Sequence, residues 1–376
     1  MTTPPLIPSS RDKLLFTPGP LTTSLTVKQA MLRDAGSWHS DFNELIADIR
    51  DRLLKLAGVS RATGWEAIPM QGSGTFGVEA VFQTCVPFNG KVAVLANGAY
   101  GERIAQMLAH ARIDHIVLRT PENVPNDPAA LSACLDTDSA ITHVAMVHCE
   151  TTSGILNAID VLGPMVRKKG KIFIVDAMSS FGALPIDLEA CGIDFLISSS
   201  NKCIEGTPGF SFVICRRSVL LAAEGCARSL SLDLLGQLRG FEKDGKFRYT
   251  PPTHILLAFE QALRELEMEG GLPGRHARYC RNHQTLQRGM HRLGFRPYLS
   301  PEVQSPIITA YHHPAGGRFD FKQLYDDLAD AGFIIYPGKL TKADTFRIAN
   351  IGRIFPADIE QLLAAIEAVM RHRFSK

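Results

Sequence analysis

From about residue 65 to residue 215, short apolar runs of strand length alternate with longer stretches of helical pattern, such as 101–112 and 158–170. Helices that alternate with apolar strands are typical of a mainly parallel sheet covered by helices on both faces. We therefore predict an α/β fold for this part of the chain. Its expected strands are residues 91–96, 114–119, 142–149, 171–177, 194–200 and 209–217.

The last of these strands departs from the parallel pattern. Only residues 201–208 separate it from the strand before it, and this connection is too short to contain a crossover helix. We therefore predict that the strand over 209–217 runs antiparallel to its neighbour. A helical stretch over 254–270 follows and ends in glycines, which are frequent at the C-termini of helices.

A second αβ pattern occupies the C-terminal part of the chain. With 376 residues, the protein is long enough for one large and one smaller domain. We expect the boundary near residues 268–274, with an N-terminal segment at 1–15, a large domain at 16–270 and a smaller α+β domain at 271–376. The second pattern comprises a helix over 274–293, strands over 306–311, 333–338 and 345–352, and a final helix from Pro356.

Composition excludes several classes of protein. A hydrophobic content of 45% and a charged content of 21% are ordinary for a globular protein, and a net charge of +2 provides no basic surface for nucleic acid. No apolar run resembles a signal peptide or approaches membrane-spanning length. The eight cysteines form no C-x-x-C pair, which favours reduced thiols over a disulfide framework or a zinc site. We expect a cytoplasmic protein without a metal.

Polar segments follow the predicted strands. In an open parallel sheet, ligands bind beyond the carboxyl ends of the strands, so these segments are expected to converge on one site. Together they supply a glycine-rich turn, a tyrosine, two threonines, an aspartate and a lysine. They are residues 71–77, 97–101, 149–154, 176–180 and 201–202.

The turn GSGTFG at 72–77 matches G-x-G-x-x-G, but we reject a dinucleotide site. The acidic residue expected about 20 positions later is missing, and the corresponding loop opens with Asn97. No Lys-Ser/Thr pair follows the glycines, which excludes a Walker P-loop. A glycine turn that opens a helix still offers free N–H groups to one phosphate, although an ordinary tight turn explains the pattern equally well.

Lys202 and Asp176 are unusual in their positions. Lys202 lies just beyond an apolar strand, and Asp176 ends the strand "IFIV". A buried charge needs a partner or a chemical role. The alternatives are a helix N-cap for Asp176 and a partly exposed, snorkelling lysine for Lys202. With a helix N-terminus for a phosphate and a nearby aromatic ring, the set fits pyridoxal 5′-phosphate, which needs a lysine for a Schiff base and an aspartate at its ring nitrogen.

Several longer motifs resemble one family. They are "FTPGPL", "GSGT", "ETTSGILN", "VDAMSSFGA", "SSSNKCIEGTPGFSF" and "FRIANIG". From about residue 13 to its C-terminus the chain resembles the class V aminotransferases, which are fold-type-I pyridoxal-phosphate enzymes. Within them, "NKCIEG" and "YPGK" are most similar to the subgroup that transfers the amino group of 2-aminoethylphosphonate to pyruvate.

The resemblance implies a role for each matching residue. Lys202 would be the Schiff-base lysine, Asp176 the partner of the pyridine nitrogen, and Arg347 the ligand of a substrate carboxylate. The loop at 17–22 would lie over the substrate. The resemblance also implies a homodimer with active sites at the interface, where Thr250 would reach the cofactor phosphate of the neighbouring chain. The other cofactor-binding residues would be Gly74, Thr75, Tyr100, Thr151 and Asn201.

The implied activity gives phosphonoacetaldehyde and L-alanine. One alternative is another class V enzyme, such as an alanine– or serine–glyoxylate aminotransferase. A cysteine desulfurase is disfavoured because Cys280, the one cysteine in the C-terminal part, lies in a helical pattern. A module that binds pyridoxal phosphate without catalysis is the alternative from a different class.

Overall fold

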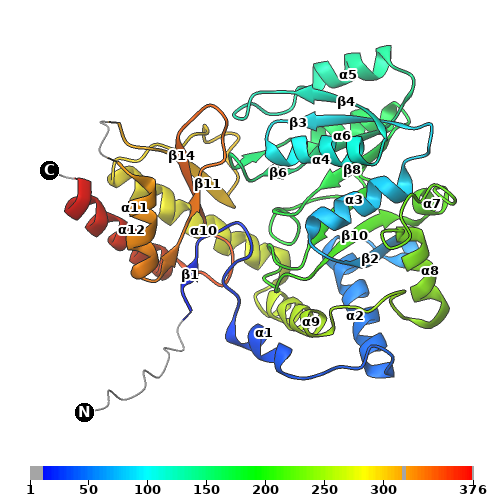
Figure 1. Ribbon diagram of the computed structural model, residues 1–376, viewed down its shortest axis with the longest axis horizontal. Coiled ribbons are helices and arrows are strands. Elements are labelled where there is room, and N and C mark those ends of the chain that lie inside the picture. Colours follow the sequence, from blue (N-terminus) through cyan, green and yellow to red (C-terminus); the bar gives the residue numbers. More distant parts are fainter. Residues whose placement is uncertain (1–11, 316–318, 375–376) are drawn as a thin grey trace.

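A computed structural model describes residues 12–315 and 319–374, so most of the expected N-terminal segment 1–15 lies outside the described residues. A seven-stranded sheet forms the centre of the larger part of the molecule (Figure 1). From one edge to the other, its strands are β2 (Trp65–Gln71), β10 (Phe210–Arg216), β9 (Phe195–Ser199), β8 (Ile172–Asp176), β5 (Ile141–Val147), β3 (Lys91–Ala96) and β4 (Asp114–Arg119).

The directions of the strands confirm the expected α/β pattern. Strands β4, β3, β5, β8 and β9 are parallel to one another, whereas β10 is antiparallel to both β9 and β2. The predicted antiparallel neighbour is therefore correct. The central strands are apolar and buried on both faces because helices cover the sheet.

Helices and short turns of the larger part connect these strands and pack around the sheet. They are α1 (Leu25–Gln29), η1 (Ala30–Leu32), α2 (Ser40–Leu56), η2 (Arg61–Thr63), α3 (Gly74–Cys85), α4 (Ala99–His110), α5 (Pro128–Thr137), α6 (Ile159–Lys168), α7 (Arg217–Leu221), α8 (Leu234–Asp244) and α9 (Thr253–Met268). A small hairpin, β6 (Cys149–Glu150) and β7 (Ile155–Leu156), follows β5.

The C-terminal part is a smaller αβ unit that stands beside the large sheet (Figure 1). Its strands β11, β14 and β13 form an antiparallel sheet in that order. Its elements are α10 (Gly271–Arg292), β11 (Ile308–His312), α11 (Phe321–Asp330), β12 (Phe333–Ile334), β13 (Tyr336–Pro337), β14 (Thr345–Ala349), α12 (Pro356–Val369) and the π-helical turn η3 (Met370–Phe374).

The strand predicted over 333–338 is two strands. The chain pairs first with the N-terminal strand β1 (Leu14–Leu15) and then, beyond the buried Ile335, with β14. The division has a topological reason, since the two halves serve different sheets. As a result, β1 packs on the C-terminal unit, and Phe16 is part of its core.

Buried apolar side chains form three clusters. The largest lies between Val27 and Leu266 around the seven-stranded sheet, and a second fills the C-terminal unit. A third lies between the two and contains Leu21, Cys203 and Tyr279. We propose that the first two cores belong to two domains that meet between α9 and α10, near the expected boundary. None of the helices in the described ranges combines the length and the apolar character that crossing a membrane requires.

Candidate active site

One cavity opens at the carboxyl ends of the central strands, where the sequence predicts a site. Seven of the candidate residues line it together with Gly19, Arg103 and Met178. The seven are Gly74, Thr75, Tyr100, Thr151, Asp176, Asn201 and Lys202. Residues from the loops after five different strands therefore meet here, as the topology of a parallel sheet requires.

Lys202 lies in the loop between β9 and β10. Its Nζ donates hydrogen bonds to the carbonyl oxygens of Pro18 at 2.9 Å and of Gly19 at 3.4 Å. Burial lowers the pKa of Lys202 to about 8, because the ammonium group loses its hydration. Neither carbonyl carries a full negative charge, so the lysine is held in place without an adjoining carboxylate.

Gly19 allows the N-terminal loop to approach the lysine closely. Its φ angle of +119° favours glycine, and a Cβ atom there would lie 2.7 Å from Nζ of Lys202. The loop at 17–22, which the resemblance places over the substrate, thus contacts the lysine directly in this structure. The pairing joins segments more than 180 residues apart.

Asp176 ends β8 with its carboxylate at the cavity. Burial raises its pKa to about 6, although the N–H of Met178 donates to Oδ1 at 2.9 Å and partly offsets this shift. The side chain is 7% exposed. At pH 7 the carboxylate is therefore mostly ionised, and within the described ranges one backbone N–H group, that of Met178, donates to it.

The start of α3 provides a free anion-binding turn. Among the described residues, the N–H groups of Gly74 and Thr75 have no hydrogen-bond partner, and the side chain of Ser73 does not cap the helix. The helix dipole and these two donors favour a phosphate. Glycine at position 74 leaves room for Met178, because a Cβ atom would lie 2.5 Å from Sδ of Met178 and that side chain would have to move.

Tyr100 stands in the first turn of α4, which is anchored by a buried carboxylate. Both N–H groups of Tyr100 and Gly101 donate to Oε2 of Glu150, at 3.0 and 3.3 Å. Thr152 donates to the other oxygen, Oε1, through its hydroxyl and its N–H. Glu150 thus caps the helix that carries Tyr100, a role that the sequence motif does not reveal.

Arg103 lies one turn after Tyr100 and faces the same cavity. Its guanidinium carbon is 4.8 Å from the centroid of the Tyr100 ring, and Nη1 donates to Oγ1 of Thr75 at 3.4 Å. The sequence analysis missed this residue. The spacing of three residues from Tyr100 in "NGAYGER" was the available signal, because positions i and i+3 share a helix face.

Arg347 lies beside the cavity rather than in its lining. On β14 its guanidinium is buried, and it donates to the carbonyl oxygens of Thr151 at 2.8 Å and Pro337 at 2.9 Å. These carbonyls orient the guanidinium without neutralising it. Thr250 is exposed and does not line the cavity of its own chain, and its carbonyl accepts a hydrogen bond from Nε2 of Gln71, at 3.4 Å.

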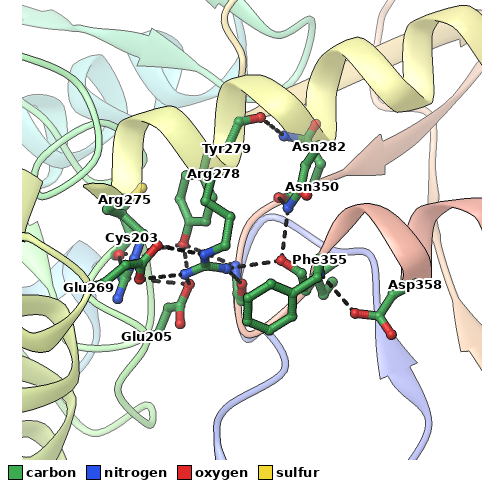
Figure 2. A network of polar contacts seen from close by, with 12 residues as sticks. Cys203, Glu205, Glu269, Arg275, Arg278, Tyr279, Asn282, Asn350, Phe355 and Asp358 are labelled. Carbon is green, nitrogen blue, oxygen red and sulfur yellow. Dashed lines mark hydrogen bonds and ion pairs between the residues drawn. The ribbon is translucent and has the colours of Figure 1, made fainter. Parts of the chain in front are cut away.

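A buried ionic network holds the loop that follows Lys202 (Figure 2). Arg278 of α10 donates to the carboxylates of Glu205, at 2.7 Å, and Glu269, also at 2.7 Å. Arg275 donates to Glu269 and to the carbonyl of Cys203, the residue next to the lysine. Helix α10 of the C-terminal unit therefore fixes the backbone immediately after Lys202.

Charge balance explains how this network is buried. Two arginines meet two carboxylates, and Tyr279 donates to Glu205 at 2.6 Å. Burial by itself raises the pKa of Glu269, but the hydrogen bonds and charges of Arg278 and Arg275 outweigh it and lower the pKa to about 2. The carboxylate of Glu269 is thus charged at neutral pH.

Comparisons with known proteins agree with this geometry. Residues 24–324 match the family model described as aminotransferase class-V. Over 362 residues the chain is 49% identical to a 2-aminoethylphosphonate–pyruvate transaminase of Syntrophobacter fumaroxidans, covering 96% of this chain and 97% of that protein. The chain belongs to the class V aminotransferases.

Two further proteins show the same likeness. A 2-aminoethylphosphonate–pyruvate transaminase of Vibrio vulnificus is 50% identical over 361 residues, which cover 96% of this aminotransferase and 98% of the relative. The crystal structure of an alanine–glyoxylate aminotransferase from Nostoc sp. superposes with a TM-score of 0.89 at 24% identity, covering 99% and 98% of the two chains. At that identity the superposition shows the fold, which is the fold-type-I architecture.

Class V aminotransferases use pyridoxal 5′-phosphate, and the residues present fit this cofactor. The cavity combines a lysine with a lowered pKa, a buried carboxylate at the end of β8 and two free N–H groups at the start of α3. The lysine fits the aldehyde of the cofactor, the carboxylate fits its ring nitrogen, and the two N–H groups fit its phosphate. The described residues contain no cluster of three or more histidine, cysteine or acidic side chains that could hold a metal ion.

Proposed function

We propose that this enzyme transfers the amino group of 2-aminoethylphosphonate to pyruvate, giving phosphonoacetaldehyde and L-alanine. The observation that carries the proposal is the identity of about 50% to transaminases of that name over 96% of the chain, combined with the lysine and aspartate that share the cavity.

Each cavity residue has a role in this proposal. Lys202 binds the cofactor covalently, and the N–H groups of Gly74 and Thr75 bind its phosphate. The carboxylate of Asp176 holds a proton at the ring nitrogen. Tyr100 stacks on the ring, Thr151 hydrogen-bonds near the ring hydroxyl, and Asn201 lines the phosphate side, which completes the set of cofactor-binding residues within one chain.

Pyridoxal phosphate supplies an aldehyde that condenses with amines and a ring that takes up the electron pair of a broken C–H bond. Lys202 then moves the proton. Because burial lowers its pKa to about 8, an appreciable fraction of Nζ is neutral near pH 7.5 and can accept a proton from the substrate carbon. The same atom, Nζ of Lys202, then donates the proton again to complete the transfer.

Arg347 binds the carboxylate of pyruvate and L-alanine in this proposal. Its two bonds to carbonyl oxygens leave three of its five N–H donors for a substrate, in the planar arrangement that suits a carboxylate. A lysine in this position could not form the same paired hydrogen bonds.

We further propose a homodimer in which Thr250 completes the site of the neighbouring chain. Thr250 is exposed and lies outside its own cavity, which supports a role in a partner's site. Large apolar side chains are also exposed near the N-terminal segment and the start of α3, and burial at an interface would account for them. They include Leu32 at 84%, Trp38 at 79% and Phe76 at 50% exposure.

The absorbance spectrum of the purified holoenzyme tests the reaction. Addition of 2-aminoethylphosphonate without pyruvate should shift the near-visible absorption of the bound cofactor to the near ultraviolet, and pyruvate should reverse the shift. The Lys202→Ala variant should bind cofactor without this response. A shift with L-alanine or L-serine but none with the phosphonate would assign the chain to another class V activity, and no shift with any amine would favour a module without catalysis.

A further inference from the structure

The donor and acceptor that the proposed function assigns differ in their acidic groups. A carboxylate carries one negative charge, whereas a phosphonate resembles a phosphate group, which carries about −1.5 to −2 at pH 7 and offers three acceptor oxygens. One arginine satisfies the first group, and the second calls for another cation. The roles assigned so far do not identify the residue that supplies this second cation.

The structure contains a group of cations around the ring of Tyr100. Nζ of Lys339 and the guanidinium carbon of Arg103 each lie 4.8 Å from the ring centroid. Arg347 is close enough to perturb the charge of Lys339. In the described part of the chain, none of these three cations forms a salt bridge.

The charge of Glu150 acts on Lys339 and Arg347 and raises their pKa values, but its oxygens are already engaged in other hydrogen bonds. Glu150 is completely buried, and its two oxygens accept from the N–H groups of Tyr100, Gly101 and Thr152 and from the Thr152 hydroxyl. Both oxygens of Glu150 are therefore already engaged in hydrogen bonds at the start of α4 and with Thr152. Partial burial of Lys339 lowers its pKa, and the charges of Arg103 and Arg347 lower it further. A bound anion would relieve this repulsion.

The three cations occupy two different sides of the site. Arg103 contacts Thr75, at the turn that fits the cofactor phosphate. Lys339 belongs to the segment 338–344, which connects β13 to β14 and so to Arg347. In the register of these strands Tyr336 lies opposite Arg347, and Lys339 follows three residues later. Lys339 and Arg347 are therefore presented by the same end of the small sheet.

The segment that carries Lys339 is held along the groove beside the cavity. Thr341 donates to the carboxylate of Glu122 through its N–H and its hydroxyl, both at 3.1 Å. Glu122 belongs to the large sheet's side of the molecule, and both residues line the groove that opens beside the cavity. Lys339 and Arg103 line the same groove, so a ligand in the cavity would meet this lysine at its open side.

We propose that Lys339 is the second cation of the substrate subsite and, together with Arg347, binds the phosphonate of the amino donor. The lysine adds the charge that a phosphonate needs and a carboxylate does not, so it favours the phosphonate substrate over carboxylate substrates. This inference rests on the proposed function, and it assigns the specificity of the same site to a residue outside the motif of the lysine and aspartate.

The Lys339→Met variant of the holoenzyme tests the proposal. Methionine retains an unbranched apolar chain over Tyr100 and removes the charge. We measure the apparent Kd of 2-aminoethylphosphonate and of L-alanine from the amplitude of the cofactor absorbance change, and the Kd of ethylphosphonate and of propionate by calorimetry. The phosphonates should bind about tenfold or more weaker, as expected for a lost hydrogen bond between charged groups, and the carboxylates should lose several times less.

Two other variants serve as controls. Lys342→Met removes the same charge from a second lysine of the same segment, which lines the same groove but, in the described part of the chain, does not lie over the Tyr100 ring, and it should leave the ratio of the phosphonate and carboxylate Kd values unchanged. Lys339→Arg keeps a cation and should retain the phosphonate preference. This variant keeps the proposal testable if the methionine variant does not fold.

Three results would overturn the inference. They are an unchanged Kd for ethylphosphonate in Lys339→Met, equal losses for ethylphosphonate and propionate, and weakened binding of the cofactor in place of the phosphonate. Failure of the proposed function is separate, because it would appear as a wild-type enzyme that binds or converts no phosphonate at all.

Discussion

At the scale of single residues, the site contains two ionisable groups, Asp176 and Lys202, whose charged forms are both disfavoured by burial. Burial raises the pKa of Asp176 to about 6 and lowers that of Lys202 to about 8. The shifts bring both groups close to neutral pH, which suits residues that hold and move protons. They also mean that the cofactor-free protein is less stable than its packing alone would make it.

Asp176→Asn should therefore stabilise the cofactor-free protein at alkaline pH while abolishing transamination. The pKa of this carboxyl rises from 3.8 to about 6 on folding, so the folded state favours the protonated form. Stability is lost as the pH rises from about 4 to above 6, by roughly 3 kcal/mol at about 1.4 kcal/mol per pKa unit. Asparagine removes this loss and retains an oxygen for the N–H of Met178.

Urea unfolding of both cofactor-free proteins checks this expectation. The variant should be more stable at pH 8, and its advantage should shrink as the pH falls toward 4.5. A difference that is the same at both pH values would show that the ionised carboxylate is not the cause.

At the scale of elements, α10 and the loop after Lys202 act as one unit. Glu205 has a left-handed φ of +66°, which is rare for a residue other than glycine, and its carboxylate accepts from Arg278 and Tyr279. The network holds this conformation in place, because the loop cannot relax without exposing or separating the buried charges. The position of the lysine thus depends on a helix that begins about 70 residues later.

Glu205→Gln should destabilise the protein by about 3–5 kcal/mol, the usual loss when one partner of a buried ion pair is removed. It leaves Arg275 and Arg278 with one carboxylate between them. A matched control is Glu224→Gln, which breaks an exposed pair with Arg239 and should cost less than about 1 kcal/mol. Denaturant midpoints at pH 7.5 compare the two, and equal losses would mean that the network contributes no more than a surface pair.

At the scale of the whole molecule, the active site gathers segments from both parts of the chain. The N-terminal loop at 17–22 covers Lys202, β14 of the C-terminal unit brings Arg347 to the carbonyl of Thr151, and Thr341 reaches Glu122 across the groove. In the proposed dimer, a segment of a second chain completes this assembly. The small unit can move relative to the large one only by breaking these contacts.

The proposed dimer predicts complementation between two defective chains. Thr250→Val should weaken cofactor binding about tenfold by removing one hydroxyl donor to the phosphate. If Thr250 acts in the partner's site, a mixed dimer with Lys202→Ala contains one site in which both residues are intact. Cofactor titration of mixed samples should then reveal sites of wild-type affinity that convert substrate.

The corresponding mixture of Thr253→Val with Lys202→Ala is the control for mixing itself. Absence of wild-type sites in the first mixture would place Thr250 in its own chain's site. A monomeric enzyme in sedimentation experiments would contradict the dimer directly.

The amino-acid sequence by itself determined the elements and the chemical core of the site. The six predicted strands of the large sheet end within a few residues of their expected bounds, because apolar runs flanked by polar loops are a local signal, whereas the edge strand β2 was not predicted. Lys202 and Asp176 were recognisable because charged residues directly after buried strands are rare. The direction of β10 followed from the length of a single connection, and that prediction was also correct.

Only the tertiary structure decided which distant groups meet. Three such contacts join segments separated by about 50 to 180 residues. They are Glu150 as the cap of α4, Gly19 against Lys202, and the arginines of α10 behind the loop that follows Lys202. No periodicity encodes such pairings, since each depends on the packing of the whole chain. For the same reason the strand expected over 333–338 divides, because its two halves meet different partners that the local pattern does not specify.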